Sequence, residues 1–133
     1  SLPTLRVIPF QFRQLFSNLL SNALKFAHVD RPPEITLRAT RQPGPAIDHP
    51  AAQADRSYQH ITVADNGIGF DPSFSHRIFE VFQRLHSRHE YSGTGIGLAI
   101  CKKIVEVHHG FITAESNPSA GATFHIYLPE EQV

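Results

Sequence analysis

An apolar run, residues 60–64, leads directly into the segment Asp65-Asn66-Gly67-Ile68-Gly69-Phe70. Because side chains alternate faces along a strand, Asp65 falls in phase with Ile61 and Val63, on the face that should point into a core. A carboxylate there is costly unless a polar group meets it, and the two glycines let a ligand approach the backbone closely. The segment therefore suggests a site for a polar heterocycle such as adenine. An Asn-Gly turn that only ends a strand is an equally weighted alternative.

A second glycine-rich segment, residues 93–98, opens a helix expected over residues 96–108. Apolar residues at positions 98, 101, 104 and 105 give this helix one apolar face. Free N–H groups at the positive end of a helix bind anions, so a phosphate is the natural guest. The pattern is neither a Walker loop nor a dinucleotide fingerprint, because no Lys-Ser or Lys-Thr follows and the glycine spacing differs. A loop that merely leads into the helix is the alternative.

The first helix is expected over residues 10–28, with a broad apolar face and a polar stripe of Asn18, Asn22 and Lys25 at helical spacing. Amide oxygens can coordinate Mg²⁺, and a lysine can meet a phosphate as a point charge. A solvated helix face is the alternative, but asparagine is a mediocre helix former, so two of them in mid-helix call for an explanation. The stripe carries no carboxylate.

Taken together, these segments resemble the boxes of the catalytic, ATP-binding domain of sensor histidine kinases, within the class that includes gyrase B, the Hsp90 chaperones and MutL. Residues 18–26 resemble the N box, 65–69 the G1 box, 78–82 the F box and 93–98 the G2 box. Their order and spacing also fit, and residues 121–129 resemble the last strand of the family. The resemblance spans nearly the whole chain.

The resemblance implies a role for each matching position. Asp65 would accept a hydrogen bond from the adenine amino group, Asn22 would coordinate Mg²⁺ with Asn18 beside it, and Lys25 would contact phosphate. The implied catalytic residues are Asn18, Asn22 and Lys25. The implied ATP-binding residues are Asn22, Lys25, Phe26, Asp65, Gly67, Ile68, Gly69, Phe79, Phe82, Arg84, Gly93, Thr94, Gly95, Ile96, Gly97, Leu98 and Thr123.

The expected fold is α/β (α+β): a two-layer sandwich of a mixed, mostly antiparallel sheet with helices on one face, the Bergerat-type ATP-binding fold. Strands are expected at residues 34–41, 59–65, 111–116 and 122–128, with a short strand before Pro9. Residues 1–133 would form one domain. Residues 43–58 are a Pro/Ala-rich insertion with little to bury, and residues 70–92 would be the ATP lid, with a short helix near 74–84.

The expected function is that of a histidine protein kinase catalytic domain that binds ATP and Mg²⁺. It would present the γ-phosphate to a histidine on an upstream dimerisation domain, which this chain lacks, and a response regulator would act downstream. A serine kinase of the anti-sigma-factor type and a nucleotide-binding module without kinase activity remain alternatives.

Composition adds further expectations about partners and location. The net charge is zero, which indicates no attraction to nucleic acid or membrane, and the isolated domain is expected to be a monomer. A cytoplasmic location is expected, with a parent kinase that is either soluble or membrane-anchored. The single cysteine, Cys101, should be a small buried hydrophobe.

Overall fold

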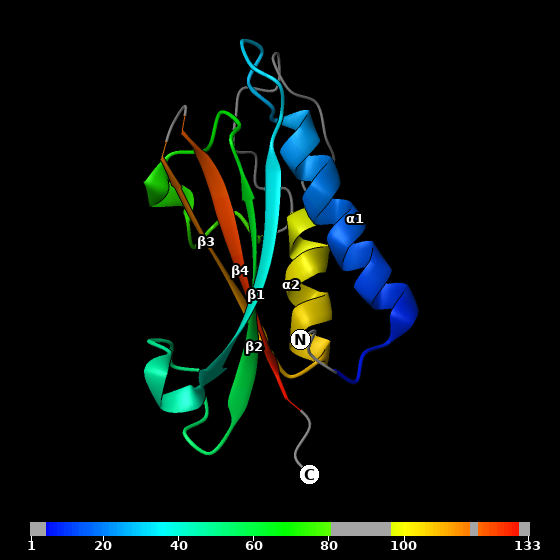
Figure 1. Cartoon of the computed structure of the whole chain (residues 1–133), viewed down its shortest axis with the longest axis vertical. Coiled ribbons are helices and arrows are strands. Elements are labelled where there is room, and N and C mark those ends of the chain that lie inside the picture. Colours follow the sequence, from blue (N-terminus) through cyan, green and yellow to red (C-terminus); the bar gives the residue numbers. More distant parts are fainter. Residues whose placement is uncertain (1–4, 81–96, 118–119, 131–133) are drawn as a thin grey trace.

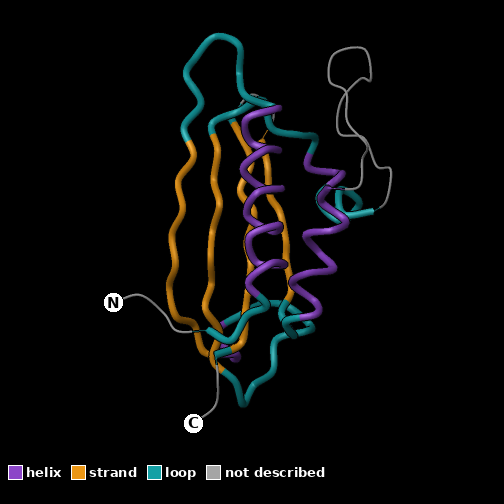
Figure 2. The backbone as a smooth tube through the Cα atoms, turned by 90° about the vertical axis from the view of Figure 1, so that its right-hand side faces the viewer, coloured by secondary structure: helices purple, strands orange, loops and turns teal. Residues whose placement is uncertain are grey.

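The computed structural model describes residues 5–80, 97–117 and 120–130. The elements in chain order are α1 (Pro9–Lys25), β1 (Ile35–Pro43), the 3-10 helix η1 (Gly44–Ala46), β2 (Ser57–Asp65), the 3-10 helix η2 (Pro72–Phe74), α2 (Gly97–Val107), β3 (Phe111–Asn117) and β4 (Gly121–Pro129). The two helices lie side by side along the sheet and cover one of its faces (Figures 1 and 2). This arrangement confirms the expected two-layer α+β sandwich.

The sheet has four strands in the order β1-β2-β4-β3, and every neighbouring pair is antiparallel. The expected mixed sheet is thus uniformly antiparallel among the described strands, and residues 5–8 before α1 form no strand. The inward positions of β2 and β4 pair directly, with Val63 opposite Phe124 and Ile61 opposite Ile126. The expected alternation of the edge strand β1 does not appear in its burial, because Ile35 is partly buried but Leu37 and Ala39 are exposed, although Leu37 pairs with Val63.

The core lies between the helix layer and the sheet. On α1 the predicted broad apolar face is only partly buried, because Leu24 is 57% exposed. The alternation of β4 and the apolar face of α2 are confirmed, and the core contains residues that the patterns place inward. They include Leu15 and Leu19 of α1, Leu98, Cys101, Ile104 and Val105 of α2, Ile61 and Val63 of β2, and Phe124, Ile126 and Leu128 of β4. No helix in the described ranges is long and apolar enough to cross a membrane.

Local backbone chemistry sets the start of α1 and the end of α2. α1 begins at a proline, a favoured first helical residue, and stops at Lys25, three residues earlier than expected. At the end of α2, Gly110 N–H donates to Val105 O and His109 takes the left-handed conformation, with φ of 65°. Gly110 is required for another reason: a Cβ there would lie 2.0 Å from Tyr127 O of β4.

The segment between β1 and β2 packs more closely than its composition predicts. Ile47 is buried in a second apolar cluster with Tyr58 and Phe111, and the His49 ring stacks on Phe111 at 4.2 Å between centroids. The expectation that residues 43–58 have little to bury was therefore wrong. It failed because the segment folds over the sheet face opposite the helices, where these aromatic rings present apolar surface.

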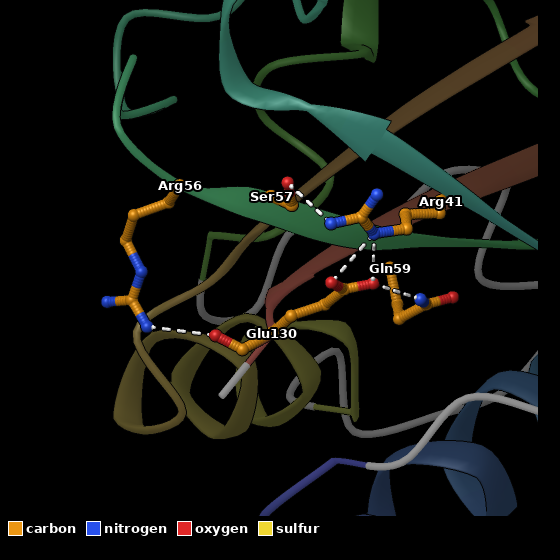
Figure 3. Close-up of polar contacts among 5 residues, drawn as sticks. All are labelled: Arg41, Arg56, Ser57, Gln59 and Glu130. Atoms are coloured by element: carbon orange, nitrogen blue, oxygen red, sulfur yellow. Dashed lines mark hydrogen bonds and ion pairs between the residues drawn. The ribbon is translucent and has the colours of Figure 1, made fainter. Parts of the chain in front are cut away.

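A polar cluster closes the end of the sheet where β4 finishes (Figure 3). The Glu130 carboxylate accepts hydrogen bonds from Arg41 Nε of β1 at 2.9 Å and from Gln59 Nε2 of β2 at 2.5 Å, while Arg56 Nη2 donates to Glu130 O at 3.3 Å. The Arg41 contact lowers the pKa of Glu130. Because Arg41 is largely exposed, this pair contributes little to stability by itself, and its main effect is to hold three strand ends together.

Candidate functional site

Asp65 ends β2 and is held by two backbone N–H groups. Asp65 Oδ1 accepts from Gly67 N–H at 2.8 Å and from Ala122 N–H of β4 at 3.3 Å. Burial raises the pKa of Asp65, and the two N–H groups partly oppose that rise. Among the residues that the structure describes, both bonds to this carboxylate end on Oδ1, which leaves Oδ2 as an acceptor for a ligand. An oriented, partly desolvated carboxylate of this kind can recognise an amino group on a flat heterocycle.

The two glycines after Asp65 are needed for different reasons. A Cβ on Gly67 would lie 2.5 Å from Phe26 O, so a side chain there has no room, and the next residue, Ile68, donates its N–H to Phe26 O at 3.0 Å. Gly69 has φ of 68°, a conformation that glycine adopts at little cost. The loop is thus packed against the end of α1, which carries Asn22 and Lys25.

A brace around Asn66 was not foreseen from the sequence. Asn66 Oδ1 accepts from Glu34 N–H at 2.9 Å, and Asn66 Nδ2 donates to Pro32 O at 3.1 Å. Arg31 Nε donates to Asn66 O at 2.9 Å. The Asn-Gly pair indicated a turn but not this partner segment, more than thirty residues earlier in the chain. The brace fixes the outer side of the loop that begins with Asp65.

The polar stripe of α1 is formed as predicted, but its residues have different surroundings. Asn18 is partly buried and faces α2, where its Nδ2 donates to Gly97 O at 3.4 Å. Next to it, the Cys101 thiol donates to Leu15 O at 3.7 Å, and burial raises the pKa of this thiol to about 12. Asn22 is half exposed, and Lys25 is exposed with Nζ 5.8 Å from the Phe26 ring centroid. α1 contains no Asp or Glu, so the stripe offers amide oxygens and one ammonium group.

The first part of the expected lid is anchored in the core. Phe70 N–H donates to Ser116 Oγ at 2.7 Å, and Phe79 is buried with its ring edge toward Phe124, 6.3 Å between centroids. Up to residue 80 the segment consists of η2 and turns, so the expected α-helix is not present in this part. Phe79 therefore acts as the predicted apolar anchor. Six predicted ligand residues lie outside the described residues: Phe82, Arg84, Gly93, Thr94, Gly95 and Ile96.

The last three predicted positions are Gly97, Leu98 and Thr123. Gly97 begins α2 and Leu98 is buried in the core. Ala122 and Phe124 both point into the core, so the Thr123 side chain lies on the opposite face of β4. The group of β4 that meets Asp65 is the Ala122 N–H, and the placement of Thr123 does not favour a contact between its side chain and a base.

A groove of about 770 Å³ follows the flank of α1, and it is a different place from the carboxylate loop. Its mostly apolar lining runs along α1 from Pro9 to Leu24, with Val7 before the helix, and it includes neither Asp65 nor Asn22. The oriented carboxylate of Asp65 is therefore not in this groove. It lies at the loop after β2, which contacts the end of α1 and the start of β4.

Comparison with known proteins points to one family. Residues 8–132 match the family model described as "Histidine kinase-, DNA gyrase B-, and HSP90-like ATPase". The chain is 46% identical over 129 residues to the phytochrome-like protein Cph1 of Synechocystis, covering 97% of this chain and 15% of that protein. It is 37% identical over 120 residues to the sensor protein KdpD of Escherichia coli, covering 90% of this chain and 12% of that protein. The chain thus spans a small part of the curated relatives it matches.

Solved structures agree with this result. The mycobacterial sensor histidine kinase MprB matches with a TM-score of 0.74 and 25% identity, over 97% of this chain and 78% of that one. Full-length ShkA in complex with AMPPNP matches with a TM-score of 0.71 and 28% identity, over 99% of this chain and 24% of that one.

Proposed function

The chain belongs to the family of histidine kinase-, DNA gyrase B- and HSP90-like ATPases, and we propose that it is the catalytic domain of a sensor histidine kinase. In this proposal the domain binds ATP with Mg²⁺ and presents the γ-phosphate to a histidine on an upstream dimerisation domain of the same parent protein. A response regulator is the downstream acceptor. The curated relatives of this chain include sensor proteins that are several times longer than the chain itself.

One observation carries the nucleotide part of the proposal: the Asp65 carboxylate is fixed through one oxygen and has the other oxygen left as an acceptor. The adenine amino group is a donor that fits this oxygen, whereas the guanine oxygen at the same ring position is an acceptor and would be repelled. Gly67 lets the loop that holds Asp65 pack against the end of α1, because a Cβ there would lie 2.5 Å from Phe26 O.

The residues on α1 fit magnesium and phosphate. When bound, MgATP supplies a transferable phosphoryl group whose charge the metal partly neutralises. Asn22 offers an amide oxygen of the kind that Mg²⁺ accepts, and Lys25 offers an exposed ammonium group one turn along the same face. Asn18 contacts the first residue of α2, so it would hold the metal-binding helix against the helix that follows the glycine-rich segment.

The same helix argues against a hydrolase. Activation of water needs a general base within reach of the phosphate, and α1 carries no carboxylate. The chain would therefore hold ATP until a histidine nucleophile is brought close to it. No observation favours the two alternatives, a serine kinase of the anti-sigma-factor type or a nucleotide-binding module without kinase activity.

Phosphoryl transfer in trans tests the proposal. The domain is incubated with labelled ATP, Mg²⁺ and a separately prepared phosphoacceptor hairpin of the parent protein. We expect acid-labile, base-stable label on the hairpin, little label on the domain alone, and loss of transfer with Asn22→Ala. Gln42→Ala, on the far edge strand, is the matched control and should transfer normally. Rapid phosphate release by the domain alone, or label on a serine, would contradict the proposal.

A further inference from the structure

The sheet face opposite the helices, called the open face below, carries a row of three polar side chains from three strands. His60 Nε2 of β2 lies 2.8 Å from His125 Nδ1 of β4, and His125 Nε2 lies 2.8 Å from Glu115 Oε1 of β3. The two imidazole centroids are 5.0 Å apart and their planes differ by 29°. With that centroid distance, the short nitrogen contact means that the rings lie edge to edge in nearly one plane.

The hydrogen-bond pattern is satisfied with both imidazoles neutral. The Glu115 carboxylate accepts, so His125 donates from Nε2, and a neutral His125 then has an unprotonated Nδ1. His60 therefore donates from Nε2 to that nitrogen. One proton thus lies between two imidazole nitrogens that face each other directly, in a position where a metal ion could replace it.

The neighbours hold the pair in place. The His60 ring stacks on Tyr127 at 4.3 Å, and Tyr127 stacks on Phe111 at 4.7 Å, so packing restricts the rotation of His60. His125 remains 21% exposed, which leaves a path from solvent. On β1, Thr40 lies opposite His60, and Arg38 lies opposite Thr62, two residue pairs further along the strands.

We propose that His60 and His125 form a binding site for a divalent transition-metal ion of the class Zn²⁺, Ni²⁺ or Cu²⁺. Imidazole nitrogens suit these ions. The ion would bond to His60 Nε2 and His125 Nδ1, and the displaced proton would move to His60 Nδ1. Both imidazoles then stay neutral and no proton is released.

Glu115 would be a positioning residue in this site. Ligating histidines usually donate their second ring N–H to a carboxylate or carbonyl, which fixes the tautomer and orients the ring, and Glu115 already does this for His125. Metal–nitrogen bonds are about 2.0–2.1 Å long, so in a tetrahedral site the nitrogens must separate by roughly half an ångström. The partly exposed His125 ring must also turn from its head-on contact with His60, so that both nitrogens point at the ion. The described residues contain no group of three or more ligands, so water would complete the coordination.

The site is distinct from the proposed nucleotide site. It uses nitrogen ligands on the open face, whereas Asn22 offers an oxygen ligand on the helix layer. Mg²⁺ prefers oxygen and should not compete for the histidine pair. Metal titration without nucleotide therefore tests this inference independently of the kinase proposal.

The experiment is calorimetric titration of the folded domain with ZnCl₂ and with NiCl₂, in a buffer containing Mg²⁺. We expect one ion per chain, at least tenfold weaker binding in His60→Gln and in His125→Gln, and weakening of about tenfold or more in Glu115→Gln. His28→Gln, which removes a histidine far from the open face, is the control and should bind like the unmodified protein.

A second measurement needs no variant and so does not depend on the folding of one. Paramagnetic Ni²⁺ should broaden the ring resonances of His60 and His125 in nuclear magnetic resonance spectra before those of the other histidines. Uniform broadening of all histidines, or equal loss of binding in His28→Gln, would show that the ion binds elsewhere. Absence of saturable binding would show that the pair shares only a proton. Each of these results would overturn the inference.

Discussion

Asp65 Oδ1 accepts the Gly67 N–H at 2.8 Å, so the carboxylate of the proposed adenine site is held by its own loop. Ala122 N–H of β4 meets the same oxygen, and the loop behind it rests on the carbonyl of Phe26 at the end of α1. Three elements thus set the direction of one carboxylate. The position of Asp65 Oδ2 follows from this, and a ligand meets an acceptor that is already oriented.

The first prediction is that Asp65→Asn separates binding from stability. ATP affinity should fall at least tenfold, because an amide can present a donor where the adenine amino group needs an acceptor. Stability at pH 7 should stay equal or rise. Burial raises the pKa of Asp65, so its ionised form is less favourable in the folded state, and its contribution to stability declines as pH rises from about 4 through the raised pKa.

Urea unfolding of both proteins at pH 4 and pH 7, with ATP titration by calorimetry, measures these two effects. Asp71→Asn is the matched control. Asp71 is exposed, accepts from Ser73 N–H and has a lowered pKa, so its contribution to stability falls as the pH falls, which is the opposite of Asp65. ATP binding should be unchanged in Asp71→Asn. Equal ATP affinity of the unmodified protein and Asp65→Asn would rule out the assigned role.

The second prediction concerns two glycines of the proposed site. Gly67→Ala should destabilise the domain by about 1–3 kcal/mol and weaken ATP binding, because the new Cβ would lie 2.5 Å from Phe26 O and must displace the loop. Gly97→Ala should be neutral or stabilising by up to about 1 kcal/mol, since it lies in α2 and, among the residues that the structure describes, no atom outside its own helix backbone lies within 4 Å of the added carbon. Thermal and urea unfolding compare the pair, and a tolerated Gly67→Ala would contradict the close packing described.

The third prediction is that the Cys101 thiol is inert in the folded protein. The residue is fully buried, and burial raises the pKa of the thiol to about 12, so almost no thiolate exists near pH 8. A disulfide reagent at pH 8 should label no thiol in the native protein and one in urea. The labelling rate in intermediate urea should follow the unfolding equilibrium. Rapid labelling without denaturant would mean that the contact between α1 and α2 opens locally.

The fourth prediction compares a buried phenylalanine of the expected lid with an exposed phenylalanine of α1. Phe79→Ala should cost about 3–5 kcal/mol, because the ring is buried against Phe124 in the main core. Phe10→Ala, at a phenylalanine that is 69% exposed on α1, should change stability by less than about 0.5 kcal/mol. Denaturant unfolding measures both. Similar effects of the two changes would show that the segment before residue 80 is not part of the cooperative core.

The sequence alone determined those features that depend on local periodicity. The apolar faces of α1 and α2 and the inward positions of β2 and β4 follow from repeats of 3.6 and 2 residues, and Asp65 followed from the same alternation. Element limits shifted by a few residues, because caps such as the left-handed His109 decide where a helix stops. Alternation also places Thr123 away from the core, although resemblance to the family had assigned it to the base.

Only the tertiary structure decided which distant groups meet. The backbone carbonyl that requires glycine at Gly67 belongs to Phe26, and the brace of Asn66 comes from residues 31–34. The pairing of His60 with His125 depends on the register between β2 and β4. Composition likewise did not show that Ile47 would find aromatic partners on the open face. The physical reason is common to all four: a periodic pattern gives the direction of a side chain, whereas its partner depends on strand register and on the path of the intervening chain.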